Sequence, residues 1–195
     1  MVLFPPDVTF EHMVFNGDNQ RMAGKEKSLA DSLVNMTPKA LADRGYQISP
    51  FTFEQAAQED SEFAFEMEQL RDAYGRASIE LYDKAMVKVT ESRNFKKSVG
   101  TVVNQFCERA EANAMLVTRF YGFDKSGGVM AKEIISAALF AALTGSYPMY
   151  PAKGSAVEVA LLNCTTGDVL WSNAKANGTV SADVLKLALD ELPHR

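Results

Sequence analysis

Only two histidines and two cysteines occur among the 195 residues, and this scarcity excludes most sites built from these side chains. His194 lies next to the last residue, so His12 is the one internal imidazole, which argues against a His-based metal site and a catalytic triad. Cys107 and Cys164 lie far apart, and neither has the close spacing of a metal or redox pair. We expect each to be a small buried apolar residue. The alternative is a disulfide between them in an oxidising compartment.

Long apolar runs and basic clusters are also missing. No stretch reaches 18 apolar residues, so we expect no segment that spans a membrane. The net charge is −5 and Lys and Arg are scattered, which argues against nucleic acid as a partner. No motif indicates a cofactor and no pair of carboxylates stands out as an acid and a base, so we expect no cofactor and no enzyme. Hydrophobic residues make up 47% of the chain, enough for the core of one domain.

Strand and helix patterns alternate along the chain. Period-two alternation predicts strands over 8–15, 46–51, 114–123, 156–164 and 169–177. Helical spacing predicts a helix around Pro38 that ends near Gly45, and helices over 61–92, 94–113, 129–143 and 183–192. This order predicts an α/β (α+β) fold: a mixed sheet with a C-terminal antiparallel hairpin, covered by helices, plus a long helical hairpin. We expect one domain over 1–195, with 61–112 as a helical elaboration.

The last two strands are predicted to form a hairpin around a three-residue loop. Gly167 suits the left-handed position of that loop, and Asn163 or Thr165 can hydrogen-bond its backbone. Trp171 is expected on the same strand face as Val169, with its ring packed under a helix. We therefore interpret Trp171 as a core anchor rather than as a platform for a ligand.

The long helix over 61–92 carries a heptad-like apolar seam that is our candidate partner-binding surface. The seam consists of Phe63, Met67, Leu70, Tyr74, Ala77 and Leu81. The alternative is that the seam packs within the chain, on the helix predicted over 94–112. In the first case the partner would be a second copy or another protein.

A glycine-containing loop between a strand and a helix is the candidate for an anion site. It contains Lys125, Ser126, Gly127 and Gly128, and backbone N–H groups at a helix start can bind phosphate. The order of residues does not match a phosphate-binding loop, in which Gly-Lys-Ser/Thr follows four spacer residues. We favour a flexible loop, and keep a small-molecule- or nucleotide-binding domain as the alternative function.

Several segments resemble one family when they are taken in order. The stretch "VEVALLNCTTGDVLWSNAKANG" is similar to the closing hairpin of bacterial envelope lipoproteins with a TolB-N-terminal-like α/β domain, the group of CsgG and LpoB. The stretches "ANAMLVTRFYGF", "LFPPDV" and "LADRGYQI" also resemble that group. Asn163 and Asp168 stand where the family usually has an acidic residue and Glu. The likeness covers most of the chain outside 61–112.

This resemblance implies a non-catalytic cell-envelope protein that acts as a binding, scaffold or assembly domain. Its partner would be itself or another envelope protein, and its location periplasmic or at the inner leaflet of the outer membrane; the alternative is cytoplasmic. No lipid-attachment cysteine lies near Met1 and no channel-forming hairpin of the curli kind is visible. A lipid anchor would therefore need a segment before Met1, and the abrupt start of strand-like sequence favours a chain that begins after an export signal.

Overall fold

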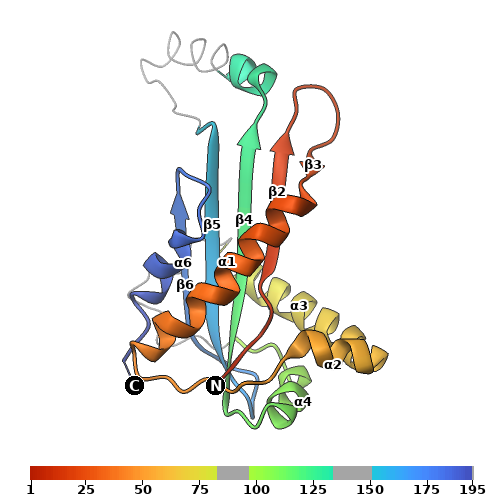
Figure 1. Ribbon diagram of the computed structural model, residues 1–195, viewed down its shortest axis with the longest axis vertical. Helices are drawn as coiled ribbons and strands as arrows, with labels where there is room; N and C mark the ends of the chain where they lie inside the picture. The colour runs from red at the N-terminus through yellow and green to blue at the C-terminus, as the bar shows by residue number, and fades with distance from the viewer. Residues whose placement is uncertain (83–96, 134–150, 195) are drawn as a thin grey trace.

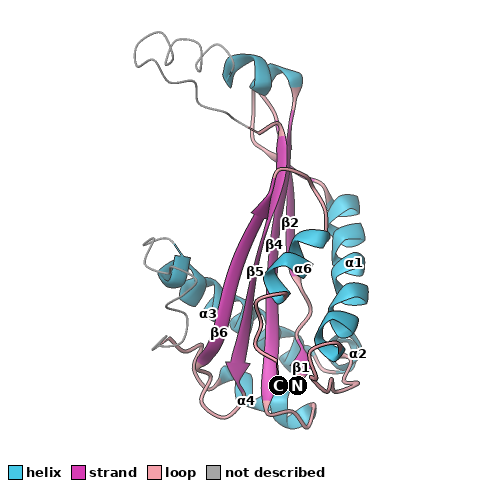
Figure 2. Cartoon of the chain, turned by 90° about the vertical axis from the view of Figure 1, so that its left-hand side faces the viewer, coloured by secondary structure: helices cyan, strands magenta, loops and turns pink. Residues whose placement is uncertain are grey.

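The computed structural model describes residues 1–82, 97–133 and 151–194, and shows a sheet covered by helices on both faces (Figure 1). Helices α1 (Ala23–Ala42) and α6 (Asp183–Leu189) cover one face, and α3 (Ser61–Tyr82) and α4 (Val102–Arg109) cover the other (Figure 2). Helix α2 (Phe53–Glu59) packs against α3. This arrangement confirms the predicted α/β class with a mixed sheet.

The sheet has six strands, and the long strand β4 lies at its centre. The strands are β1 (Val2–Leu3), β2 (Asp7–Met13), β3 (Gln20–Arg21), β4 (Ala114–Lys125), β5 (Lys153–Asn163) and β6 (Val169–Asn177). Their order is β3-β2-β4-β5-β6, and β1 also pairs with β4. Both β1 and β2 run parallel to β4, whereas β5 and β6 are antiparallel to their neighbours. Pro5 and Pro6 separate β1 from β2, because a proline has no N–H to donate to the ladder.

The predicted C-terminal hairpin is confirmed. Gly167 has φ of +72°, and the side chain of Asn163 accepts hydrogen bonds from the backbone N–H groups of Thr165 (2.7 Å) and Thr166 (3.1 Å). Trp171 is a core residue, as predicted, and lies opposite Leu161. It does not share a face with Val169, because an irregularity between Leu161 and Leu162 shifts the register by one residue.

Two separate hydrophobic cores lie on the two faces of the sheet. The first joins α2, α3 and α4 to one face and includes Phe53, Phe63, Phe106 and Met115. The second joins α1 and α6 to the other face and includes Leu33, Phe120, Trp171 and Leu185. Strand β5 supplies both cores, because its side chains point alternately to the two faces. Its apolar run over both faces is therefore the mark of a central strand.

The predicted strand over 46–51 is wrong. This segment has no regular secondary structure and runs along the edge of the sheet, where the Ser49 N–H donates to the Met1 carbonyl (2.7 Å). Pro50 has no N–H, so the segment cannot extend this pairing. Helix α2 begins shortly afterwards, at Phe53, and had no counterpart among the predicted elements.

The predicted helix over 94–113 is shorter than expected. Residues 97–99 are extended: the Val99 N–H donates to the Gly167 carbonyl (2.9 Å), and the Lys97 carbonyl accepts from the Val169 N–H (2.8 Å). Gly100, with φ of +78°, then turns the chain into α4. The backbone N–H of Val99 and the carbonyl of Lys97 therefore form hydrogen bonds with the β5–β6 hairpin instead of the hydrogen bonds of a longer helix.

The other predicted helices correspond to described elements in part. Helix α1 continues through Pro38, and the buried Thr37 hydroxyl donates to the Leu33 carbonyl (2.6 Å). The predictions over 83–92, 94–96 and most of 129–143 lie outside the described residues, although a helix is present over 127–133. No helix in the described ranges combines the length and the apolar character that crossing a membrane requires.

Candidate functional site

The apolar seam of α3 lies inside the protein. Five of its members, Phe63, Met67, Leu70, Tyr74 and Ala77, are at most 7% exposed. The Phe63 ring lies 6.0 Å from the Phe53 ring of α2 and 5.1 Å from the Phe106 ring of α4. The side chain of Leu81 lies outside the described residues. The described part of the seam therefore packs within the chain, which was the alternative interpretation, and an association surface must be sought elsewhere.

The candidate anion loop holds its cation in an internal ion pair. Lys125 ends β4 and its side chain is only 8% exposed; its Nζ donates to both carboxylate oxygens of Glu133 (2.7 and 2.8 Å). The backbone N–H of Ser126 donates to the Met13 carbonyl (2.8 Å). Gly127 and Gly128 begin the helix, and a side chain at Gly128 would meet Phe15 at 2.9 Å. These contacts give Lys125, Ser126 and Gly128 structural roles.

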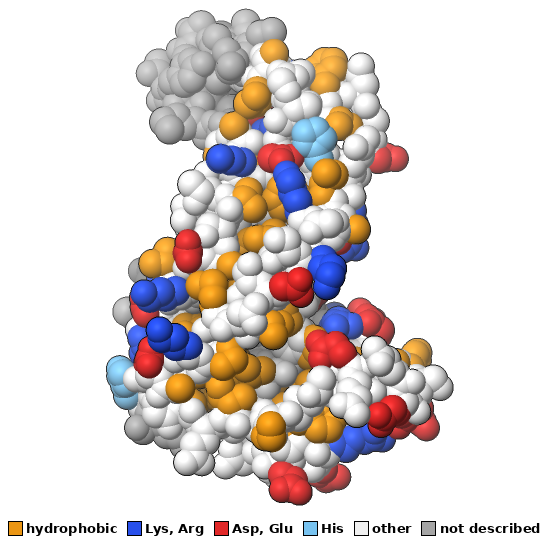
Figure 3. Space-filling model, viewed as in Figure 1, with side chains coloured by type: hydrophobic (Ala, Val, Ile, Leu, Met, Phe, Trp, Pro, Cys, Tyr) orange, Lys and Arg blue, Asp and Glu red, His pale blue; other side chains and the backbone are white. Residues whose placement is uncertain are grey.

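Two surfaces have the properties of a binding site, and one of them is a groove between α1 and α6. It has a volume of about 490 Å³. Its apolar lining comes from Met36 and Ala40 of α1 and from Leu185 and Leu189 of α6. Figure 3 shows charged side chains beside apolar ones over the lower ends of these two helices. The groove can therefore accept an apolar side chain while its rim contacts polar groups.

The charged rim of this groove has three cations, Lys39, Arg44 and Lys186, and two carboxylates, Asp43 and Asp190. Arg44 is 14% exposed and is held by the carbonyls of Leu192 (2.6 Å) and Asp190 (2.7 Å) and by the Asp190 carboxylate (3.4 Å). Lys39 on α1 and Lys186 on α6 also line the groove, and neither forms an ion pair with any of the described residues. These two lysines are free to contact carboxylates of a partner.

The outward side of α3 is the second such surface. Phe65 is 63% exposed and Ile79 is 56% exposed, although both lie on a helix whose other side is in the core. The outward stripe consists of Glu62, Phe65, Gln69, Asp72, Arg76 and Ile79, at alternating steps of three and four residues. Residues 53–82 contain eight acidic and two basic residues, a net charge of −6, against −5 for the whole chain. The acidic charge of the protein is thus concentrated in α2 and α3.

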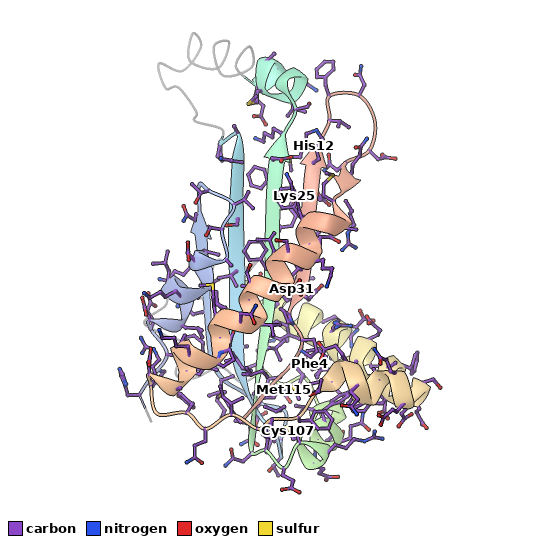
Figure 4. The ribbon with its side chains drawn as sticks, in the orientation of Figure 1. Phe4, His12, Lys25, Asp31, Cys107 and Met115 are labelled. Atoms are coloured by element: carbon purple, nitrogen blue, oxygen red, sulfur yellow. A yellow bond between two sulfur atoms is a disulfide. The ribbon has the colours of Figure 1, made fainter. Side chains whose placement is uncertain are left out.

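A polar cluster lies where β2 and β4 end, and Figure 4 shows its members His12 and Lys25 close together. Asp124 accepts from Lys25 (2.6 Å) and lies 2.5 Å from Nδ1 of His12. Partial burial alone would raise the pKa of Asp124, but the hydrogen bonds from Lys25 and His12 outweigh it and hold this pKa below its ordinary value. Lys25 also lies over the Phe10 ring, 4.4 Å from its centre. The cluster fastens α1 to the sheet, and its His–Asp pair is a geometry that could support proton transfer.

Cys107 and Cys164 form a disulfide, so the expectation that they are separate buried residues is wrong. Their Cα atoms are 5.7 Å apart, and 57 positions separate them in the chain. The bond joins α4 to the turn that follows β5, next to a hydrogen bond from Asn104 Nδ2 to the Thr165 carbonyl (3.2 Å). The alternative, a disulfide between them, is therefore the one that the structure shows.

Comparison with protein-family models and with curated proteins finds no match to this chain. Within residues 1–82, 97–133 and 151–194, no three His, Cys, Asp or Glu side chains are grouped as they would be to hold a metal ion.

Sequence reasoning missed the groove and the polar cluster because each depends on contacts between distant residues. His12 and Asp124 are 112 positions apart, and Lys39 and Lys186 lie on helices whose pairing the sequence does not specify. The acidic concentration over 53–82 was readable from the sequence.

Proposed function

We propose that this chain is a non-catalytic, periplasmic domain of the bacterial cell envelope that binds a second copy of itself or another envelope protein. The observation that carries the proposal is the disulfide between Cys107 and Cys164. Disulfides of this kind persist in the periplasm and outside the cell, whereas thiol-reducing systems remove them from the cytosol of most organisms. A bond that joins two core elements supports a chain that folds in an oxidising compartment.

The surfaces of the protein support a role in binding. One surface has an exposed aromatic side chain on an acidic helix face, and the other is a groove whose lysines form no ion pair within the part of the chain that the structure describes. Both are suited to association with other macromolecules. The resemblance of the C-terminal hairpin to envelope lipoproteins points in the same direction. Attachment to the inner leaflet of the outer membrane through a lipid would need a cysteine in a segment before Met1, which the upstream codons would reveal.

The alternative of a nucleotide- or small-molecule-binding domain has weaker support. Its candidate cation, Lys125, already pairs with Glu133 through both carboxylate oxygens. A phosphate would have to displace this ion pair before it could bind the loop. A thermal-shift screen with inorganic phosphate and nucleotides tests this alternative, and stabilisation that Lys125→Ala abolishes would favour it over our proposal.

The proposed compartment is tested by trapping thiols in the organism that makes the protein. Cells are quenched in acid, the denatured protein is alkylated with a maleimide polymer, and the shift of its band is measured with and without prior reduction. We expect no shift before reduction and a shift by two adducts after it, since Cys107 and Cys164 are the two cysteines. A chain that carries two adducts before reduction would contradict an oxidising compartment and remove the main support for the proposal.

A further inference from the structure

We propose that the acidic outward face of α3 in one copy docks into the α1–α6 groove of a second copy, so that the chain assembles head to tail. This inference rests on the proposed function and specifies its partner as the chain itself. It names two surfaces, the α3 face around Phe65 and the groove rimmed by Lys39 and Lys186.

Charge complementarity is the first argument. Residues 53–82 have a net charge of −6, and the rest of the chain therefore has a net charge of +1. The groove presents Lys39 and Lys186 without ion-pair partners among the described residues. Arg44 pairs with Asp190, and Asp43 is the remaining carboxylate, so the rim has a net charge of +1. Opposite charges on two surfaces steer the encounter and fix its orientation, whereas two acidic faces or two basic grooves would repel each other.

The apolar groups of the two surfaces also correspond. Phe65 projects from the acidic face with 63% of its area exposed; Glu62 precedes it on the stripe, and Asp72 follows beyond Gln69. The groove offers an apolar lining between its two lysines. An aromatic anchor in an apolar pocket with charges at the rim is the usual arrangement of an interface with a buried hot spot. In this arrangement Glu62, one turn before Phe65, and Asp72, two turns after it, face the rim of the groove where the lysines lie.

The positions of the two surfaces determine the type of assembly. The α3 face and the α1–α6 groove lie on opposite sides of the sheet (Figure 2). A contact between two different surfaces is heterologous, so each added copy leaves one free face and one free groove. The chain therefore forms a ring or a linear array rather than a closed dimer, which fits a scaffold or assembly domain.

Two charge-reversal variants test the proposal by sedimentation velocity over a range of protein and salt concentrations. Variant A is K39E/K186E, with an acidic groove, and variant B is E62K/D72K, with a basic α3 face. We expect the wild type to associate at low salt and to dissociate as salt screens the charges. Each variant alone should bind itself more than about tenfold more weakly, because like charges now meet. A mixture of A and B should recover the association, since each face again meets a groove of opposite charge.

The control for variant A is K27E/K153E, which makes the same change in net charge at two exposed lysines outside the groove. It should associate like the wild type. Phe65→Ser should weaken association without lowering the melting temperature, because this side chain is exposed. A wild type that stays monomeric at high concentration and low salt would overturn the proposal, as would association that A and B leave unchanged. Neither result bears on the thiol test, so failure of this inference and failure of the proposed function can be told apart.

Discussion

Removal of the disulfide should destabilise the protein strongly. The suitable change is C107A/C164A, because both side chains are at most 5% exposed and alanine places no polar group in their sites. The bond closes a loop of 57 positions between α4 and the β5–β6 turn. Without it the unfolded chain gains conformational freedom that the folded chain does not gain.

The size of the effect follows from the length of this loop. A cross-link over 57 positions lowers the entropy of the unfolded chain by an amount worth about 4 kcal/mol at room temperature. In a chain of 195 residues, each kcal/mol corresponds to roughly 2–4 °C in the melting temperature, so we expect a decrease of roughly 8–16 °C. The two alanine sites add a small loss of core contacts in the same direction.

The assay is urea unfolding followed by tryptophan fluorescence, since Trp171 is the one tryptophan and lies in the core. Reduction of the wild type with dithiothreitol should reproduce the destabilisation without any change of side chain. The C107A/C164A variant should be insensitive to the same treatment. A free energy of unfolding that falls by less than about 1 kcal/mol would refute the loop-entropy reasoning, because the cross-link would then restrict the unfolded chain far less than the length of its loop predicts.

Three further changes test other parts of the fold. Gly167→Ala should cost about 2 kcal/mol or more, because its φ is +72° and the new Cβ would lie 2.1 Å from the Gly100 carbonyl oxygen; a loss below about 0.5 kcal/mol in urea unfolding would contradict this. Glu111→Gly should raise the free energy of unfolding by up to about 1 kcal/mol, because Glu111 has φ of +48° after the end of α4. A decrease would show that its side chain matters more than its backbone strain. The pKa of Asp124 is lowered in the folded state, so its carboxylate stabilises the fold above its unfolded pKa of about 4 and loses this effect as pH falls below that value. Asp124→Asn should therefore lower stability at pH 7 and reduce the loss between pH 7 and pH 3; equal losses in both proteins would be the contrary result.

Local patterns in the sequence were sufficient to predict the hairpin and the fold class. Gly167 and Asn163 carry turn chemistry that acts over a few residues, and the aliphatic run of β5 indicates a strand between two helical layers. The errors arose where distant segments compete for the same backbone groups. Residues 97–100 carry helix-forming neighbours but bond to the turn at Gly167 instead. The disulfide between Cys107 and Cys164 likewise depends on α4 lying next to the turn that follows β5. Hydrophobic periodicity in the sequence does not show that these two segments are neighbours.

The candidate site was less accessible to sequence reasoning than the fold. Phe63 and Phe65 are two positions apart and chemically identical, yet one is fully buried and the other is 63% exposed. The heptad-like spacing selected the buried stripe, because a seam inside a protein and a seam between proteins have the same period. Only the positions of α2 and α4 determine which of the two stripes of α3 remains exposed.

The parallel pairing of β2 with β4 has a consequence for the order in which the chain folds. His12 and Asp124 are neighbours across this ladder but 112 positions apart along the chain. During synthesis at ordinary rates, the N-terminal strand leaves the ribosome on the order of 10 s before its partner exists. During that interval Val8 and Phe10 can contact α1, which follows β2 directly in the chain, but not β4. The β2–β4 ladder therefore closes only after residues 114–125 have been made, and such non-local pairing is a slow step of folding.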